Sequence, residues 1–259
     1  MAFARLRAEG RTGLVTYVTA GDPDLARTAD VLMALYSAGA DVLEVGVPFS
    51  DPLADGPVIQ RASERALRQG TTLAAVLHLV AGLRAKLRAP VVLFSYVNPI
   101  LRMGPDLFAG KAADAGVDGV LALDLPADEA GELRDRLARH DIDSIFLLSP
   151  TSTAARIGQA ASLGRGFLYA VSRLGVTGAG ARLAQTARPL VNRIREQTNL
   201  PIAVGFGVAT PAHVREIGGF ADAAVVGSAL VSVIETAAGG ECLAQRVFDC
   251  VRWLKGSPQ

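Results

Sequence analysis

Short apolar segments alternate along the chain with longer segments in which apolar residues recur at helical spacing. Several of the short segments are continuous hydrophobic runs, which is typical of parallel strands covered on both faces. The longer segments predict helices, most clearly over residues 25–38, 73–87, 128–139 and 183–197. Eight strands are predicted, over residues 14–19, 41–45, 91–96, 119–123, 144–148, 167–171, 202–204 and 223–226.

The number of strand–helix units predicts the fold. Eight units in 259 residues are typical of a (β/α)8 TIM barrel, an α/β fold. A doubly wound open sheet is the alternative, but such a sheet usually has a glycine fingerprint after its first strand. The residues at 20–23, Ala-Gly-Asp-Pro, do not match one. Because there is no linker or abrupt change in composition, we expect residues 1–259 to form a single domain.

Composition and charge narrow the class of protein. The formal net charge is +1, so no basic field points to nucleic acid or to an anionic membrane surface. No apolar run is long enough to span a bilayer, and the first residues are not followed by the apolar core of a signal peptide. We therefore expect a cytoplasmic protein. No histidine has another ligand at metal-binding spacing, so no metal site is expected.

Two carboxylates after the second strand are candidates for acid–base chemistry. Glu44 sits near the carboxyl end of that strand, which is where active groups of such barrels lie. Its apolar neighbours in 42–47 should desolvate it and raise its pKa, so that it could act as an acid near neutral pH. The loop that follows holds Asp51 and Asp55, and spacing alone does not choose between them. Either aspartate could also simply form a turn.

Two glycine-rich turns predict a phosphate site. Gly205 and Gly207 follow the seventh strand, and Gly227 and Ser228 follow the eighth and open a short helix. Backbone amides at these two places can converge on an anion, although the glycines could instead only permit tight turns. The segment 172–182, after the sixth strand, is glycine-rich and long. It is either a lid over the site or a flexible surface loop.

Several motifs together resemble the tryptophan synthase alpha subunit family. The longest runs from Glu44 to Pro57 and reads EVGVPFSDPLADGP. The other matching blocks follow in the expected order, at residues 19–23, 96–99, 124–126, 172–173 with 175–178, 205–208 and 227–229. The resemblance implies a (β/α)8 barrel that cleaves indole-3-glycerol phosphate to indole and glyceraldehyde 3-phosphate without a metal or organic cofactor. It also implies an alpha2-beta2 complex with a pyridoxal-phosphate beta subunit, which receives the indole.

The resemblance also assigns residue roles. Glu44 would protonate the indole ring at C3 and help remove the proton of the glycerol hydroxyl. Asp55 matches the second catalytic position, which settles the choice over Asp51, and would stabilise positive charge at the indole N–H. The matching binding residues are Tyr17, Phe94 and Leu121 around the ring, Tyr169 beside Glu44, Thr177 in the lid, and Gly178, Phe206, Gly207, Gly227 and Ser228 at the phosphate. Tyr17 stands where phenylalanine is common, and Leu174 replaces a residue that is often smaller or polar.

Three other interpretations remain. A metal-dependent sugar-phosphate epimerase or isomerase would need histidine at the strand ends, and none lies there. A stand-alone lyase of the same family would release free indole, and only activity without a partner would distinguish it. An inactive barrel kept as a binding or regulatory subunit should have lost its catalytic carboxylates, whereas Glu44 and Asp55 are both present.

Overall fold

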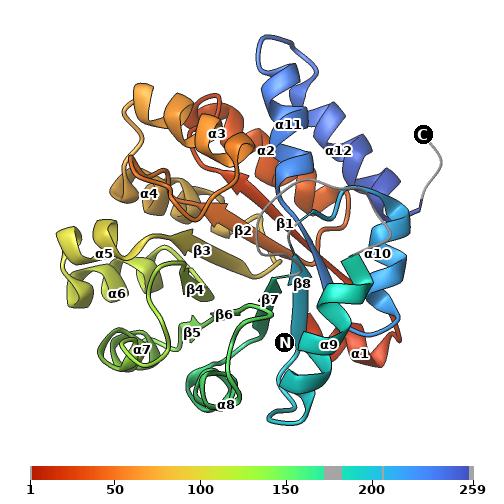
Figure 1. The fold of residues 1–259 in the computed structure, drawn as a ribbon. Helices are drawn as coiled ribbons and strands as arrows, with labels where there is room; N and C mark the ends of the chain where they lie inside the picture. Colours follow the sequence, from red (N-terminus) through yellow and green to blue (C-terminus); the bar gives the residue numbers. More distant parts are fainter. Residues whose placement is uncertain (1, 172–182, 206, 257–259) are drawn as a thin grey trace.

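The strands of the protein form one parallel sheet that curves into a barrel (Figure 1). The computed structural model describes residues 2–171, 183–205 and 207–256. Neighbouring strands follow the order β5-β4-β3-β2-β1-β9-β8-β7-β6. The strands are β1 (Gly13–Thr19), β2 (Val42–Gly46), β3 (Val91–Ser95), β4 (Gly119–Ala122), β5 (Asp143–Ser144), β6 (Phe146–Leu148), β7 (Leu168–Val171), β8 (Ile202–Gly205) and β9 (Ala223–Val226).

The two short strands β5 and β6 together occupy one position of the barrel. β5 pairs with β4, and β6 pairs with β7. Ile145 alone separates them, and its backbone N–H donates to the Val120 carbonyl at 2.9 Å. The predicted strand at 144–148 is therefore a single passage that closes the ring. The predicted (β/α)8 barrel is confirmed, since all eight predicted strands are found at their expected places.

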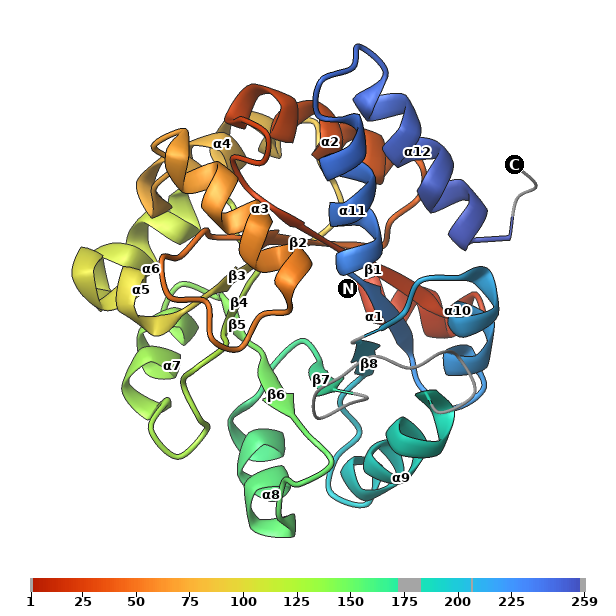
Figure 2. The same ribbon diagram turned by 45° about the horizontal axis from the view of Figure 1, so that its top comes forward.

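Helices surround the ring of strands, as the view in Figure 2 shows. Local residues set the helix starts: Asp24 caps the helix that begins at Leu25 by accepting from the Arg27 N–H at 2.8 Å, and Pro211 is the first residue of its helix. The helix expected over 128–139 begins only at Gly131. The residues before it form turns, in one of which the Glu129 N–H donates to the Pro126 carbonyl. No described helix has the length and apolar character of a membrane span. The helices are α1 (Ala2–Ala8), α2 (Leu25–Ser37), α3 (Pro57–Arg68), α4 (Leu73–Arg84), α5 (Val97–Met103), α6 (Pro105–Asp114), α7 (Gly131–Ala138), α8 (Ala154–Leu163), α9 (Leu183–Arg195), α10 (Pro211–Gly218), α11 (Ser228–Ala237) and α12 (Leu243–Leu254).

Two buried clusters explain the continuous apolar runs in the strands. One lies between the strands and the helices, and the other fills the barrel interior. In β1, for example, Leu14 and Val18 belong to the first cluster, and Val15 and Tyr17 belong to the second. Helix α1 closes the amino end of the barrel, where Phe3 packs on Phe167 with ring centroids 5.3 Å apart. The carboxyl end of the barrel is therefore the end at which a substrate could enter.

Ion pairs fix the two helices that flank this end of the barrel, α3 and α11. Arg65 of α3 binds the buried Asp22 through two hydrogen bonds of 2.8 Å, and its third bond, also 2.8 Å, goes to Glu235 of α11. Arg61 reaches the same glutamate at 2.8 and 2.9 Å. Because paired bonds of this kind fix direction as well as distance, α3 and the last turn of α11 are held side by side.

Candidate active site

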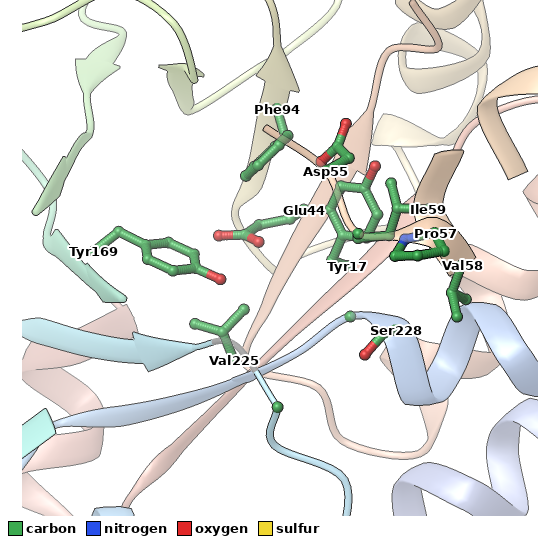
Figure 3. Close-up of a pocket in the computed structure, with 13 residues that line it drawn as sticks. Tyr17, Glu44, Asp55, Pro57, Val58, Ile59, Phe94, Tyr169, Val225 and Ser228 are labelled. Carbon is green, nitrogen blue, oxygen red and sulfur yellow. The ribbon is translucent and has the colours of Figure 1, made fainter. Parts of the chain in front are cut away.

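A cavity of about 270 Å³ opens at the carboxyl end of the barrel (Figure 3). Most of its wall is apolar or aromatic, and its polar side chains are few, which is typical of small-molecule sites. Eight of the predicted site residues line it. These are Tyr17, Glu44, Asp55, Phe94, Tyr169, Gly207, Gly227 and Ser228.

Glu44 reaches into the cavity from β2, between Tyr169 on one side and Tyr17 on the other (Figure 3). It is only 1 % exposed, and neither carboxyl oxygen has a hydrogen-bond partner among the described residues. Burial without partners disfavours the charged form and raises the pKa of Glu44 to about 8. At neutral pH the side chain therefore carries a proton that it can donate to a substrate.

Asp55 enters the same cavity from the loop between β2 and α3. Its Oδ2 accepts a hydrogen bond from the Tyr96 hydroxyl at 3.1 Å. Burial raises the pKa of Asp55 to about 6, and the bond from Tyr96 opposes that rise. Asp55 is therefore ionised at neutral pH, when Glu44 is protonated. Because their pKa values differ, Glu44 can act as an acid at the same pH at which Asp55 acts as an anion.

The structure also separates Asp55 from Asp51, which the spacing of the residues could not do. Asp51 is exposed and does not line the cavity. It lines a different hollow on the outer side of the same loop, together with Leu53 and Arg61. The position of Asp55 inside the cavity agrees with the choice that the resemblance made.

Aromatic rings form the walls beside Glu44. Tyr17 and Phe94 meet edge to face, with ring centroids 5.1 Å apart. Burial raises the pKa of Tyr17 and of Tyr169, so both hydroxyls stay neutral. Leu121 belongs to the same interior cluster but does not line the cavity.

Two glycines make room for the tyrosine hydroxyls. A Cβ at Gly46 would lie 2.2 Å from the Tyr17 hydroxyl oxygen, and one at Gly205 would lie 2.1 Å from that of Tyr169. A larger residue on either strand would displace the neighbouring ring. Gly205, which the sequence places in the phosphate turn, therefore serves the aromatic wall and does not line the cavity.

The turn residues at the far side of the cavity are suited to binding an anion. Gly227 is the N-cap of α11 and Ser228 is its first residue, so backbone N–H groups of the first turn are not used within the helix. Gly207 has a φ of +88°, a left-handed conformation that favours glycine. The predicted residues Phe206, Thr177 and Gly178, together with the predicted lid over 172–182, lie outside the described residues.

Sequence reasoning missed several lining residues. Val58 and Ile59 belong to the first turn of α3, directly after the Gly56-Pro57 pair that follows Asp55, and Val225 lies in β9. The position of α3 immediately after the Asp55 loop was the available signal. Val225 alternates along β9 with outward-facing neighbours, but nothing local to it indicates a cavity. Among the described residues no group of three His, Cys, Asp or Glu side chains could hold a metal ion.

Comparison with known proteins shows the family of this chain. The family model described as tryptophan synthase alpha chain matches residues 3–255. A tryptophan synthase alpha chain from Citrifermentans bemidjiense is 51% identical over 243 residues, covering 94% of this chain and 91% of the relative. One from Geotalea uraniireducens is 48% identical over 253 residues, covering 98% and 94%.

Solved structures show the same relationship. Tryptophan synthase from Mycobacterium tuberculosis matches with a TM-score of 0.90 and 38% identity, covering 98% of this chain and 95% of that chain. The tryptophan synthase subunit alpha from Legionella pneumophila matches with a TM-score of 0.87 and 37% identity, with coverage of 98% and 95%. At these identities the similarity extends beyond the fold.

Proposed function

Because the chain belongs to the tryptophan synthase alpha chain family, we propose that the cavity holding Glu44 and Asp55 is the site at which it cleaves indole-3-glycerol phosphate to indole and glyceraldehyde 3-phosphate. One observation carries the assignment: two carboxyl groups with separated pKa values face one mostly apolar cavity. The enzyme is a carbon–carbon lyase of tryptophan biosynthesis. Its retro-aldol reaction needs an acid, a base and a negative charge that stabilises the cationic ring. Glu44 can act as the acid and the base, and Asp55 can supply the negative charge.

The cavity orients the substrate from both ends. The flat indole ring lies against Tyr17 and Phe94, and the phosphate binds the backbone N–H groups near Gly207, Gly227 and Ser228. The family match also assigns Leu121 to the ring, and Phe206, Thr177 and Gly178 to the phosphate and the lid. Leu121 lies in the interior cluster but does not line the cavity, and the other three lie outside the described residues. Binding of the ring and of the phosphate fixes the reacting carbon near Glu44. The substrate therefore loses much of its translational and rotational freedom on binding, before the chemical step.

Proton transfer through Glu44 drives the cleavage. The protonated Glu44 donates its proton to C3 of the indole ring, and the ring becomes cationic at N1. Ionised Asp55 accepts the N1 hydrogen bond and stabilises that charge. The Glu44 carboxylate then takes the proton of the glycerol hydroxyl next to C3. The O–H electrons form the aldehyde C=O bond, the carbon–carbon bond breaks, and its electrons neutralise the ring. Glu44 ends protonated again, with the proton of the hydroxyl, and its original proton remains on C3 of the released indole.

The rate should depend on pH in two opposing steps. Asp55 must be ionised, so kcat/KM is expected to rise as pH increases through about 6. Glu44 must be protonated, so kcat/KM is expected to fall as pH increases through about 8. Steady-state assays between pH 5 and 9.5 would measure both limbs. A rate that keeps rising above pH 8 would contradict a protonated Glu44 as the acid.

The phosphate assignment predicts a separate effect on substrate affinity. Gly207→Val should raise KM about tenfold to a hundredfold, because the β-branched residue resists a φ of +88° and displaces amides that bind a charged group. The kcat value should change much less. Gly104→Val is the matched control, since Gly104 has a φ of +91° and lies at the start of α6. Equal KM values for the two variants would refute the anion site.

The partner belongs to the same proposal. The chain pairs with a tryptophan synthase beta subunit in an alpha2-beta2 heterotetramer, and indole passes to that subunit for synthesis of L-tryptophan. Leu53 supports this, because it is a large apolar side chain, 83 % exposed, on the loop that carries Asp55. A cytoplasmic location and a single domain over residues 1–259 complete the proposal, the latter supported by the one sheet that contains every described strand.

One assay tests the proposed function. The purified chain is mixed with indole-3-glycerol phosphate, and indole and glyceraldehyde 3-phosphate are measured with and without a beta subunit. Equal amounts of the two products are expected, and with the beta subunit and serine the indole should appear as tryptophan. Turnover that is no faster with the beta subunit would favour a stand-alone lyase. No cleavage under either condition would overturn the function.

A further inference from the structure

Tyr96 connects the barrel to the loop that carries Asp55. It lies between β3 and α5, and only 5 % of it is exposed. Its hydroxyl oxygen is 3.0 Å from the backbone nitrogen of Ala54 and 3.1 Å from Asp55 Oδ2. A backbone N–H can only donate, so the hydroxyl accepts from Ala54 and directs its single proton at the carboxylate. From this geometry we infer that Tyr96 is the positioning residue that sets Asp55 for the cleavage.

Contacts on other sides of Tyr96 make it a fixed reference. Its ring stacks on Phe49, with centroids 4.9 Å apart and an interplanar angle of 29°. The Val97 N–H, directly after it in the chain, donates to Asp124 Oδ1 at 2.7 Å. The hydroxyl of Ser95 donates to the Tyr96 carbonyl at 2.8 Å. Tyr96 is thus tied to the ends of β3 and β4 and to the start of the loop.

The loop and the start of α3 bind the backbone of Asp55 and not its carboxylate: the Asp55 N–H donates to the Pro52 carbonyl at 3.0 Å, and the Asp55 carbonyl accepts from Gln60 Nε2 at 2.9 Å. The segment from 48 to 56 is half-buried or exposed at most positions, and Asp55 is half-buried. Because Oδ2 is occupied by the Tyr96 proton, the direction of the carboxylate is set and Oδ1 remains for the indole N–H. Tyr96 does not touch the reacting atoms in this arrangement, so it acts through Asp55.

The same hydrogen bond keeps Asp55 ionised. The groups that face Asp55 are Tyr17 from β1 and Tyr169 from β7, which are neutral, and Glu44 from β2 lies deeper in the cavity. Asp124, beside Tyr96, adds a further negative charge. None of these four side chains stabilises a negative charge on Asp55, and burial disfavours that charge. The Tyr96 donor is the contact that lowers the pKa of Asp55.

This inference rests on the proposed function, and Tyr96→Phe tests it. The variant keeps the ring that stacks on Phe49 and removes only the hydroxyl. We expect kcat to fall about tenfold to a hundredfold, the loss typical of a hydrogen bond to a charged group, with little change in KM. The acidic limb of the pH profile should move to higher pH, because the ionised form of Asp55 loses its donor. A purely structural role would not move that limb.

Two comparisons isolate the effect. Tyr36→Phe is the matched control, because Tyr36 lies on α2 among the barrel-covering residues and not at the cavity. If Tyr96 acts through Asp55, the double variant Tyr96→Phe/Asp55→Asn should be no slower than Asp55→Asn alone. Independent losses in the two variants would contradict the inference.

A second substitution keeps the test decisive if Tyr96→Phe fails to fold. Placing 3-fluorotyrosine at position 96 retains the ring and the hydroxyl but makes the hydroxyl a stronger donor. The acidic limb should then move to lower pH, opposite in sign to the Phe variant. Cleavage by the unmodified enzyme with no shift in either variant would overturn the inference and leave the proposed function intact. No cleavage by the unmodified enzyme would instead overturn the function.

Discussion

Replacing Glu44 by glutamine is expected to lower kcat for indole-3-glycerol phosphate cleavage by about 10³- to 10⁴-fold, the upper part of the range for a lost acid–base group. The amide has nearly the same shape, but it can neither donate the proton to C3 nor take the proton from the hydroxyl. Both chemical steps are therefore lost together. The binding surfaces at the ring and at the phosphate are unchanged.

Binding and turnover should separate in this variant. Calorimetric titration of Glu44→Gln with indole-3-glycerol phosphate should give a dissociation constant close to that of the unmodified enzyme, because slow turnover leaves the substrate intact. Glu64→Gln is the matched control, since Glu64 is exposed on α3. A turnover of Glu44→Gln within tenfold of that control would refute the role of Glu44.

The stability of the Glu44 variant checks the burial argument. The pKa of Glu44 is raised from 4.5 to about 8 in the folded protein, so the unmodified enzyme loses stability as pH rises between these values. Glutamine does not ionise, and that loss should be absent. Thermal unfolding at pH 9 should therefore give Glu44→Gln a midpoint at or above that of the unmodified enzyme, which also shows that lost activity is not lost folding.

Replacing Asp55 by asparagine is expected to lower kcat by about 10²- to 10³-fold, as for other losses of a group that stabilises charge in the transition state. Asparagine can still accept a hydrogen bond from the indole N–H, but it brings no negative charge to the ring cation. The acidic limb of the pH profile near 6 should disappear with the carboxylate. The substrate phosphate also has a pKa of about 6. Loss of the acidic limb in the Asp55→Asn variant would show that the limb comes from Asp55 and not from the phosphate.

The same loop provides the control. Asp51→Asn makes the identical chemical change four positions earlier, at an exposed residue outside the cavity. Its kcat value and its pH profile should match those of the unmodified enzyme. If Asp51→Asn were as slow as Asp55→Asn, the loss would reflect the loop and not the charge in the site.

The positions of strands and helices could be predicted because they depend on patterns within a few residues. The apolar runs that predict β1 and β9 are continuous because each strand is covered by helices outside and by side chains inside. Glu44 stood out for the same reason, as a charged residue within such a run. The start of α7 was misplaced because the turns before it carry a helix-like pattern of side chains without the helical hydrogen bonds.

Contacts between distant segments could not be predicted in this way. The closeness of Gly205 to the Tyr169 hydroxyl depends on neighbouring strands, β7 and β8, and their register. The bond between Tyr96 and Asp55 joins residues 41 positions apart. Val58, Ile59 and Val225 line the cavity together although α3 and β9 are far apart in the sequence.

The sequence by itself therefore determined the barrel, its strand order along the chain and the two acidic candidates, since hydrophobic period and turn residues act locally. The structure agrees with the family resemblance that Asp55 and not Asp51 lies with Glu44 at the cavity. Tertiary structure alone decided that the two carboxyl groups have different pKa values and that Tyr96 holds one of them. Those outcomes depend on how far each group is removed from water and on what lies within 3 to 4 Å of it. Both quantities exist only after the ring of strands has closed.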